Sequence, residues 1–307
     1  MITVSNYHYI REHYNNAFPS IFGVTPQEFK SQLKKFKNDG DFIMPSDFLK
    51  NYDELVQSKD NFYFITFDDG LKEQFEFAVP ILDEFDTQAI YFANSINSEE
   101  KRVSTVHKIH LLRSILSPQK ILNHLESNKI EKLSDHELEL AQINYRFDDS
   151  NSATLKYLLN FKIPFEIQEK LVHSLFEQHF SEKEICDLLY MNDYQLKYLA
   201  DLNCLGSHSH SHFPLGLLDE NKLNYELSHS KIYFENLTKS TIQMIAYPYG
   251  TPIACNDVVA NAAKAYGYSY GFTVKTGKID DLQNKLLMNR FDCNDLIGGK
   301  NYRVWKI

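Results

Sequence analysis

The segment Phe62–Phe67 is apolar on both faces and is followed at once by two adjacent carboxylates and a glycine. Such a segment is typical of a parallel strand that helices cover on both sides. Segments with strand patterns alternate with segments of helical spacing from residue 2 to residue 92, and again from residue 202 to residue 291. Residues 25–28 have the pattern of a capping box that begins a helix, residues 72–85 have helical spacing, and residues 285–291 are the last predicted strand. This alternation predicts an α/β fold with a parallel sheet.

The chemistry-bearing residues follow two of these apolar segments. Asp68 and Asp69 come after the first, and His208 and His212 come after the second. Either pair alone is a weak signal, because carboxylate pairs in turns and surface histidines are common. Active sites of α/β folds gather where strands end. Together the pairs supply three ligands for a hydrolytic metal site and a spare carboxylate that can take a proton from water.

A third histidine, His210, lies between the other two. If this segment were a strand, His208, His210 and His212 would share one face. We expect His210 to be a bystander or a hydrogen-bond partner of a ligand. It is the replacement ligand if His212 is not one.

Three fragments resemble the motifs of the polysaccharide deacetylase family (carbohydrate esterase family 4). Residues 66–70, Thr-Phe-Asp-Asp-Gly, are similar to its first motif. Residues 207–212 are similar to the second motif, and residues 246–250, Ala-Tyr-Pro-Tyr-Gly, to a variant of the third. The resemblance covers residues 1–95 and 196–292. Three motifs in the right order make a strong signal.

The resemblance implies a fold and a set of roles. The fold is a distorted (β/α) barrel of the polysaccharide deacetylase type. Asp69, His208 and His212 would bind a divalent metal, with zinc expected first, and Asp68 would be the base that activates water. The backbone N–H of Tyr249 would form half of an oxyanion hole for the tetrahedral intermediate.

The sequence departs from the commoner family pattern in two places. Many members have an arginine where this chain has Ala246, and that arginine steers the base aspartate. Many also end with Leu-x-His, which supplies the general acid, whereas residues 287–290 here are Leu-Met-Asn-Arg. Arg290 is therefore a candidate for orienting Asp68, because arginine forks onto carboxylates well.

The N-terminus offers a general acid. Residues 6–9 and 24–29 resemble the start of an exopolysaccharide-deacetylase-like branch of the family. In that branch the acid histidine comes from the first strand, so the resemblance implies that His8 protonates the leaving amine. The alternative is that His8 is a structural histidine.

The middle of the chain has a different pattern. Residues 101–200 are helical in spacing almost throughout, with a capping box at residues 134–137. We interpret them as an α-helical insertion subdomain within a discontinuous α/β catalytic domain formed by residues 1–100 and 201–307.

The net charge limits the classes of binding partner, and the cysteine pattern indicates the cellular compartment. The net charge of −9 argues against nucleic acid and against an anionic membrane surface as partners. No signal peptide is recognised and no stretch approaches 18 uninterrupted apolar residues. Four cysteines without Cys-x-x-Cys spacing predict reduced buried thiols and a cytoplasmic protein.

These observations favour a metal-dependent amidohydrolase that removes an acetyl group from an N-acetylated amino sugar. A sugar nucleotide or a surface-glycan precursor is the expected substrate, and a small molecule or an oligosaccharide is the expected partner. The oligomeric state is left open, and a homo-oligomer is one of the alternatives. Two alternatives remain: hydrolysis of an O-ester, a formyl group or a non-sugar amide at the same site, and a catalytically silent glycan-binding homologue.

Overall fold

The computed structural model describes residues 1–12 and 23–302, and these divide into two compact units. The first unit comprises residues 1–12, 23–102 and 186–302, and the second is Val103–Ile185. Residues 186–200 therefore belong to the first unit and not to the helical segment in which we expected them. The reason is that Leu196, Leu199 and Ala200 are buried in the core of the first unit.

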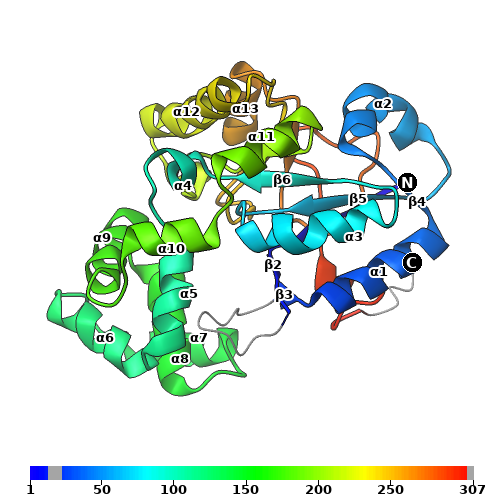
Figure 1. Cartoon of the computed structure of the whole chain (residues 1–307). Coiled ribbons are helices and arrows are strands. Elements are labelled where there is room, and N and C mark those ends of the chain that lie inside the picture. The colour runs from blue at the N-terminus through cyan, green and yellow to red at the C-terminus, as the bar shows by residue number, and fades with distance from the viewer. Residues whose placement is uncertain (13–22, 303–307) are drawn as a thin grey trace. The chain divides into compact units, whose positions relative to one another are not determined.

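The first unit is built on one parallel sheet with the strand order β10-β1-β5-β6-β7-β8-β9, and β4 pairs with β5. Figure 1 labels β4, β5 and β6 of this sheet. Its strands are β1 (Ile2–Tyr7), β4 (Asp41–Phe42), β5 (Phe62–Phe67), β6 (Ala89–Ala93), β7 (Leu205–Ser207), β8 (Met244–Ala246), β9 (Tyr270–Phe272) and β10 (Phe291–Asp292). A short parallel pair, β2 (Tyr9–Ile10) and β3 (Gly23–Val24), lies outside this sheet.

The segment that follows β9 links the two edges of the sheet. Met288 makes a parallel bridge to Phe272 of β9, and Ile279 makes an antiparallel bridge to Ile2 of β1. The sheet is therefore a curled half-barrel, and the predicted distorted (β/α) barrel is confirmed. The strand expected at residues 285–291 is shorter than predicted, because the chain bridges β9 at Met288 and pairs with β1 only from Phe291.

Successive residues of β5 pack into two different apolar clusters. Tyr63, Ile65 and Phe67 lie in the cluster that also contains the buried faces of the surrounding helices. Phe64 lies in the other cluster and stacks on Phe48, with ring centroids 4.4 Å apart. Burial on both faces explains why this strand is a continuous apolar run.

Helices surround the sheet. The capping box predicted at Thr25 and Glu28 is present and begins the first of them. The helix expected at residues 72–85 is a π-helical turn that continues into α3. The helices of this unit are α1 (Pro26–Asp39), α2 (Pro45–Gln57), η1 (Gln74–Ala78), α3 (Val79–Asp83), α4 (Ser95–Glu99), α11 (Asp193–Asp201), η3 (Leu215–Leu217), α12 (Glu220–Thr238), α13 (Asp257–Ala265) and η4 (Cys293–Asp295).

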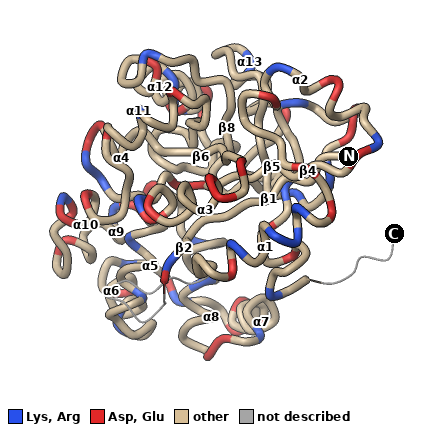
Figure 2. The backbone as a smooth tube through the Cα atoms, turned by 45° about the vertical axis from the view of Figure 1, so that its right-hand side comes forward, with Lys and Arg blue, Asp and Glu red and all other residues tan. Residues whose placement is uncertain are grey.

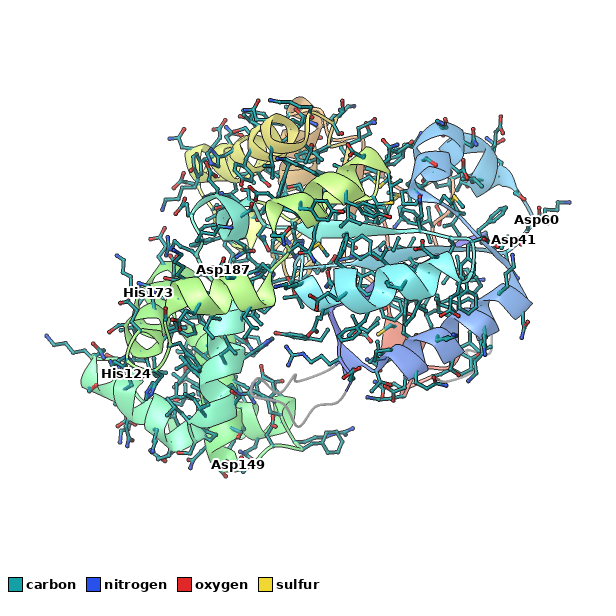
Figure 3. All side chains as sticks on the ribbon, viewed as in Figure 1. Asp41, Asp60, His124, Asp149, His173 and Asp187 are labelled. Carbon is teal, nitrogen blue, oxygen red and sulfur yellow. The ribbon has the colours of Figure 1, made fainter. Side chains whose placement is uncertain are left out.

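The second unit is helical. Lys108 is buried within it and pairs with Glu182 at 2.6 Å and with Nδ1 of His173 at 3.0 Å; His173 is labelled in Figure 3. Its helices are α5 (Thr105–Ile115), α6 (Pro118–Ser127), α7 (Asp135–Asn144), α8 (Ser150–Tyr157), η2 (Leu158–Lys162), α9 (Phe165–Phe176) and the start of α10 (Glu182–Leu189).

Along the described part of the backbone, acidic residues (red in Figure 2) and basic residues (blue) are interspersed. Among the helices of residues 1–12 and 23–302, none combines the length and the apolar character that crossing a membrane requires.

Candidate active site and metal centre

The two carboxylates lie at the turn that follows β5. Asp68 directly follows β5 and extends its pairing with β1, because its N–H donates to the carbonyl of Tyr7 at 2.9 Å. Asp69 and Gly70 then adopt left-handed backbone conformations, with φ of 78° and 61°. A Cβ on Gly70 would lie 2.7 Å from the Cβ of Ala93, so only glycine fits there. This turn lets two adjacent carboxylates reach one site.

The histidines lie on the loop that follows β7. The strand ends at Ser207, and Ser209 and His212 have φ of 63° and 61°. The three histidines therefore do not share a strand face. His208 and His212 face Asp69, whereas Nδ1 of His210 contacts Ser95 Oγ at 2.7 Å.

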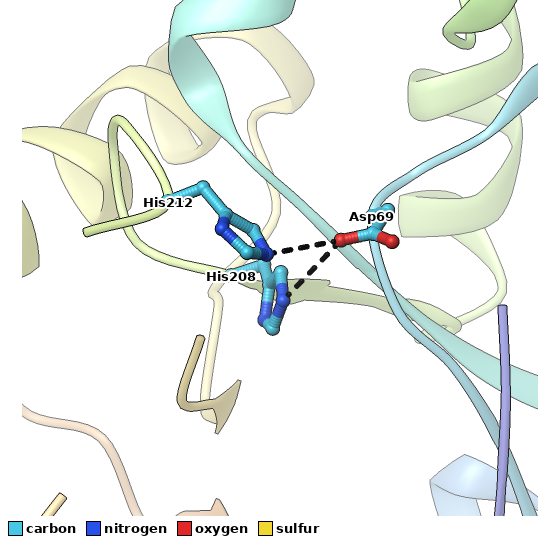
Figure 4. A group of neighbouring side chains, drawn as sticks. All are labelled: Asp69, His208 and His212. Atoms are coloured by element: carbon cyan, nitrogen blue, oxygen red, sulfur yellow. Dashed lines mark ion pairs between the residues drawn. The ribbon is translucent and has the colours of Figure 1, made fainter. Parts of the chain in front are cut away.

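Asp69, His208 and His212 form a compact group of side chains that could hold a metal ion (Figure 4). Oδ1 of Asp69 lies 3.5 Å from Nε2 of His208 and 3.3 Å from Nε2 of His212. Ligands about 2.0–2.2 Å from a tetrahedral zinc ion are separated by about 3.3 Å, so the spacing fits such an ion. All three residues are buried.

The surroundings of His208 suit a ligand. Its Nδ1 lies 2.8 Å from the carbonyl of Ala246, and a carbonyl only accepts, so Nδ1 carries the hydrogen. Nε2 then presents a lone pair towards Asp69, which is the arrangement of a metal-binding histidine. Burial lowers the pKa of His208 to about 4, despite the neighbouring carboxylates, and this favours the neutral, ligating form.

Arg290 holds Asp68 through two parallel hydrogen bonds. Nη1 donates to Oδ1 and Nη2 donates to Oδ2, both at 2.7 Å. The side chain of Arg290 is 1% exposed, and its Nε donates to the carbonyl of Thr273 at 2.9 Å. Nη1 also lies 3.2 Å from Oδ1 of Asn6 and from Oγ1 of Thr66. The guanidinium is therefore fixed by three different strands or strand ends.

This pairing determines the charge of Asp68. Burial is the largest single effect and raises the pKa of the carboxyl. The charge and hydrogen bonds of Arg290, together with the nearby His208 and His8, outweigh it and hold the pKa below its ordinary value. Asp68 is thus an ionised carboxylate beside the metal-ligating group. The structure brings together the two residues that the sequence suggested as a pair.

His8 lies beside the same carboxylate. Its Nε2 is 3.9 Å from Oδ2 of Asp68, which is too long for a hydrogen bond, and its side chain is 40% exposed. The backbone is anchored, because Nε2 of Gln74 donates to the carbonyl of His8 at 2.8 Å and to that of Asp68 at 2.6 Å. His8 can therefore be reached from solvent while its main chain stays fixed.

Tyr249 lies next to His212, one of the candidate metal ligands. Its ring centroid is 5.1 Å from that of His212. Tyr249 and Gly250 have φ of 62° and 55°, so the chain turns sharply after β8. A Cβ on Gly250 would lie 2.6 Å from the backbone nitrogen of Val274.

Sequence reasoning missed three residues that hold the site. Gln74 ties the ends of β1 and β5 together, as described above. Asn94 donates to the carbonyl of His208, and the carboxylate of Glu226 accepts from the N–H groups of His210 and Ser211 at 3.0 and 2.8 Å. Asn94 directly follows β6, a position that could have drawn attention to it. Glu226 is in the middle of a helix, where no local signal marks it.

Comparison with known proteins agrees with this geometry. A family model described as "Polysaccharide deacetylase" matches residues 191–271, a range that includes the second and third motifs but not residues 66–70. No curated protein sequence is significantly similar to the chain.

Solved structures share the fold at low sequence identity. A deacetylase from Streptococcus pyogenes, PplD, solved with acetate, has a TM-score of 0.59 and 17% identity, over 95% of this chain and 91% of that one. A polysaccharide deacetylase from Bacillus cereus has a TM-score of 0.55 and 16% identity, over 95% of this chain but 64% of that one. The BpsB deacetylase domain of Bordetella bronchiseptica has a TM-score of 0.56 and 14% identity, over 94% of both chains. The resemblance to polysaccharide deacetylases is confirmed.

Proposed function

We propose that this chain is a metal-dependent amidohydrolase that removes the acetyl group from an N-acetylated amino sugar. The observation that carries the proposal is a buried group of one carboxylate and two histidines, beside a second carboxylate held by an arginine fork. The match to the polysaccharide deacetylase family model supports the choice of substrate class.

Asp69, His208 and His212 would hold the metal. A divalent ion bound there, zinc by expectation, supplies a Lewis acid for the amide carbonyl and lowers the pKa of water. These residues fit such an ion because they offer one anionic oxygen and two neutral imidazole nitrogens.

Asp68 would act as the base. It takes the proton of the attacking water, and Arg290 orients it through both carboxylate oxygens. The backbone N–H of Tyr249 would donate to the oxygen on which negative charge develops. Its place beside His212 supports this role.

His8 would give a proton to the leaving nitrogen. An amine leaves poorly without a proton, so an acid has to be within reach of it. The exposure of His8 and its position beside Asp68 support the assignment. Because His8 and Asp68 are neighbours, the two would exchange protons within one catalytic cycle.

The experiment is a substrate panel with the full chain, stripped of metal and reloaded with zinc. The panel contains an N-acetylglucosamine oligomer, UDP-N-acetylglucosamine, the free N-acetyl sugar and an O-acetylated sugar. We expect acetate and free amine in equal amounts from one of the N-acetyl substrates. Acetate without amine would favour the ester alternative, and no release from any substrate would favour the silent homologue.

A further inference from the structure

A second group of side chains that could hold a metal ion includes His210, which lies on the loop after β7. Glu99 ends α4, His210 is on the loop and His229 is on α12. One ligand atom from each lies within 4.8 Å of the others. His210 is buried, and Glu99 and His229 are each about one-third exposed, so an ion could enter from solvent.

The side chains of this group are already in contact. Nε2 of His229 is 2.7 Å from Oε2 of Glu99, a hydrogen bond that an ion would replace by taking the proton's place between nitrogen and oxygen. The imidazole rings of His210 and His229 meet edge to face with centroids 4.7 Å apart. A second carboxylate lies beside the group, since Nε2 of His210 is 3.2 Å from Oε1 of Glu100.

Neighbouring groups fix both rings. Nδ1 of His210 contacts Oγ of Ser95 at 2.7 Å, which leaves Nε2 on the side of the carboxylates. The ring of His229 is stacked on that of Tyr225, with centroids 4.7 Å apart and planes at 18°. The hydrogen bond restrains the ring of His210 and the stacking restrains the ring of His229. A ligand that is already restrained in this way loses little freedom when it binds an ion.

We propose that Glu99, His210 and His229 bind a second divalent cation of the zinc type. Two imidazoles and a carboxylate form a donor set that this class of ion accepts. Glu100 beside His210 adds a second negative charge, and a divalent ion neutralises the two charges. Arg102 partly offsets them, but its Nη1 approaches the other oxygen of Glu100, Oε2, at 3.8 Å.

Bound there, the cation would fasten the catalytic loop. His210 lies two residues from each of His208 and His212, and its backbone is already tied to Glu226 on α12. A cation shared by α4, α12 and the loop would therefore hold the loop in place without entering the catalytic group.

The test counts ions. Full-length protein is stripped with a chelator and titrated with Zn²⁺ by calorimetry, with elemental analysis after desalting. We expect two ions per chain for the wild type and one for His229→Gln. Glu99→Gln serves as a second variant in case His229→Gln fails to fold. His179→Gln, an exposed histidine outside both groups, is the matched control and keeps two.

The variant Asp69→Asn separates this proposal from the proposed function. Asparagine tolerates the left-handed backbone at this position but is a weaker ligand, so one ion should remain. In that background Zn²⁺ should raise the Tm, and the added His229→Gln change should remove the rise. Two ions in His229→Gln, or none in Asp69→Asn, would overturn the second site. A wild type with one ion that Asp69→Asn retains would uphold the second site and contradict the catalytic one.

Discussion

Two adjacent aspartates have different surroundings, and this difference is the basis of the separate roles that we propose for them. Asp69 faces two histidines and Asp68 faces an arginine. Asp68→Asn keeps the size of the side chain but cannot accept a proton. We expect turnover to fall by about 10²-fold or more while zinc content stays at the wild-type level. Rates like those of the wild type would mean that another group activates the water.

In the proposed mechanism, Arg290 orients Asp68 through two parallel hydrogen bonds. Arg290→Lys retains a buried positive charge but cannot donate to both oxygens of Asp68 at once. Lower kcat with unchanged KM and unchanged zinc content is therefore expected, measured by steady-state kinetics on the substrate that the panel identifies. Arg290→Met is the more severe change, because it leaves a buried carboxylate unpaired, at a cost of about 3–5 kcal/mol in the free energy of unfolding. Equal kcat in Arg290→Lys and the wild type would show that orientation does not matter.

His8 is tested by the leaving group. Amides need a proton on the departing nitrogen, whereas activated esters need little protonation. His8→Ala should therefore reduce amide hydrolysis much more than hydrolysis of an activated acetyl ester, when both are assayed with the same zinc-loaded protein. Equal losses on the two substrates would place the acid elsewhere.

At the scale of single residues, the sequence predicted which side chains gather but not how each one faces. Strand ends and motif order were sufficient to select Asp68, Asp69, His208 and His212. The orientation of His210 depends on where β7 ends and on two left-handed residues, Ser209 and His212. Positive φ at a non-glycine residue has no dependable sequence signal.

At the scale of elements, capping and apolar runs were dependable predictors and strand ends were less so. The capping boxes at residues 25–28 and 134–137 are present. The last predicted strand, residues 285–291, forms only the two-residue strand β10. The sequence pattern cannot show where this strand begins. Within one apolar segment, Met288 bridges to β9 and Phe291 then pairs with β1.

The helical unit contains an ion pair whose loss should be costly. Burial is the largest single effect and raises the pKa of Glu182. The hydrogen bonds from Lys108 and from the N–H of Val103, together with the charge of Lys108, outweigh it, so the pKa lies below the ordinary value of 4.5. The folded carboxyl thus releases its proton more readily than the unfolded one. Its contribution to stability is present above about pH 4.5 and is lost as the pH falls through the lowered folded pKa.

Glu182→Gln should therefore destabilise the protein at pH 7 by up to about 3 kcal/mol, because Lys108 is left buried and charged. Lys108→Met removes the charge itself and should cost less. Chemical denaturation followed by circular dichroism at pH 7 and pH 4 measures both effects. The difference between Glu182→Gln and the wild type should shrink at pH 4. A constant difference would mean that the ion pair does not control stability.

At the scale of the whole molecule, the sequence predicted an α/β unit interrupted by helices, and the boundary was the uncertain part. Helical spacing continues through α11, so the pattern offers no break at residue 186. What assigns α11 to the first unit is the burial of its apolar face in that core, together with its packing against α12 and β7. Such a preference depends on tertiary contacts that spacing does not encode.

The central claim is that one buried metal group performs the hydrolysis, and His208→Ala tests it most directly. Zinc content and amine release are measured on the same preparation, with His136→Ala on the exposed face of α7 as control. We predict that the wild type and the control retain zinc at the catalytic group and release amine, while His208→Ala loses that ion and releases none. Amine release by His208→Ala at the wild-type rate would contradict the account.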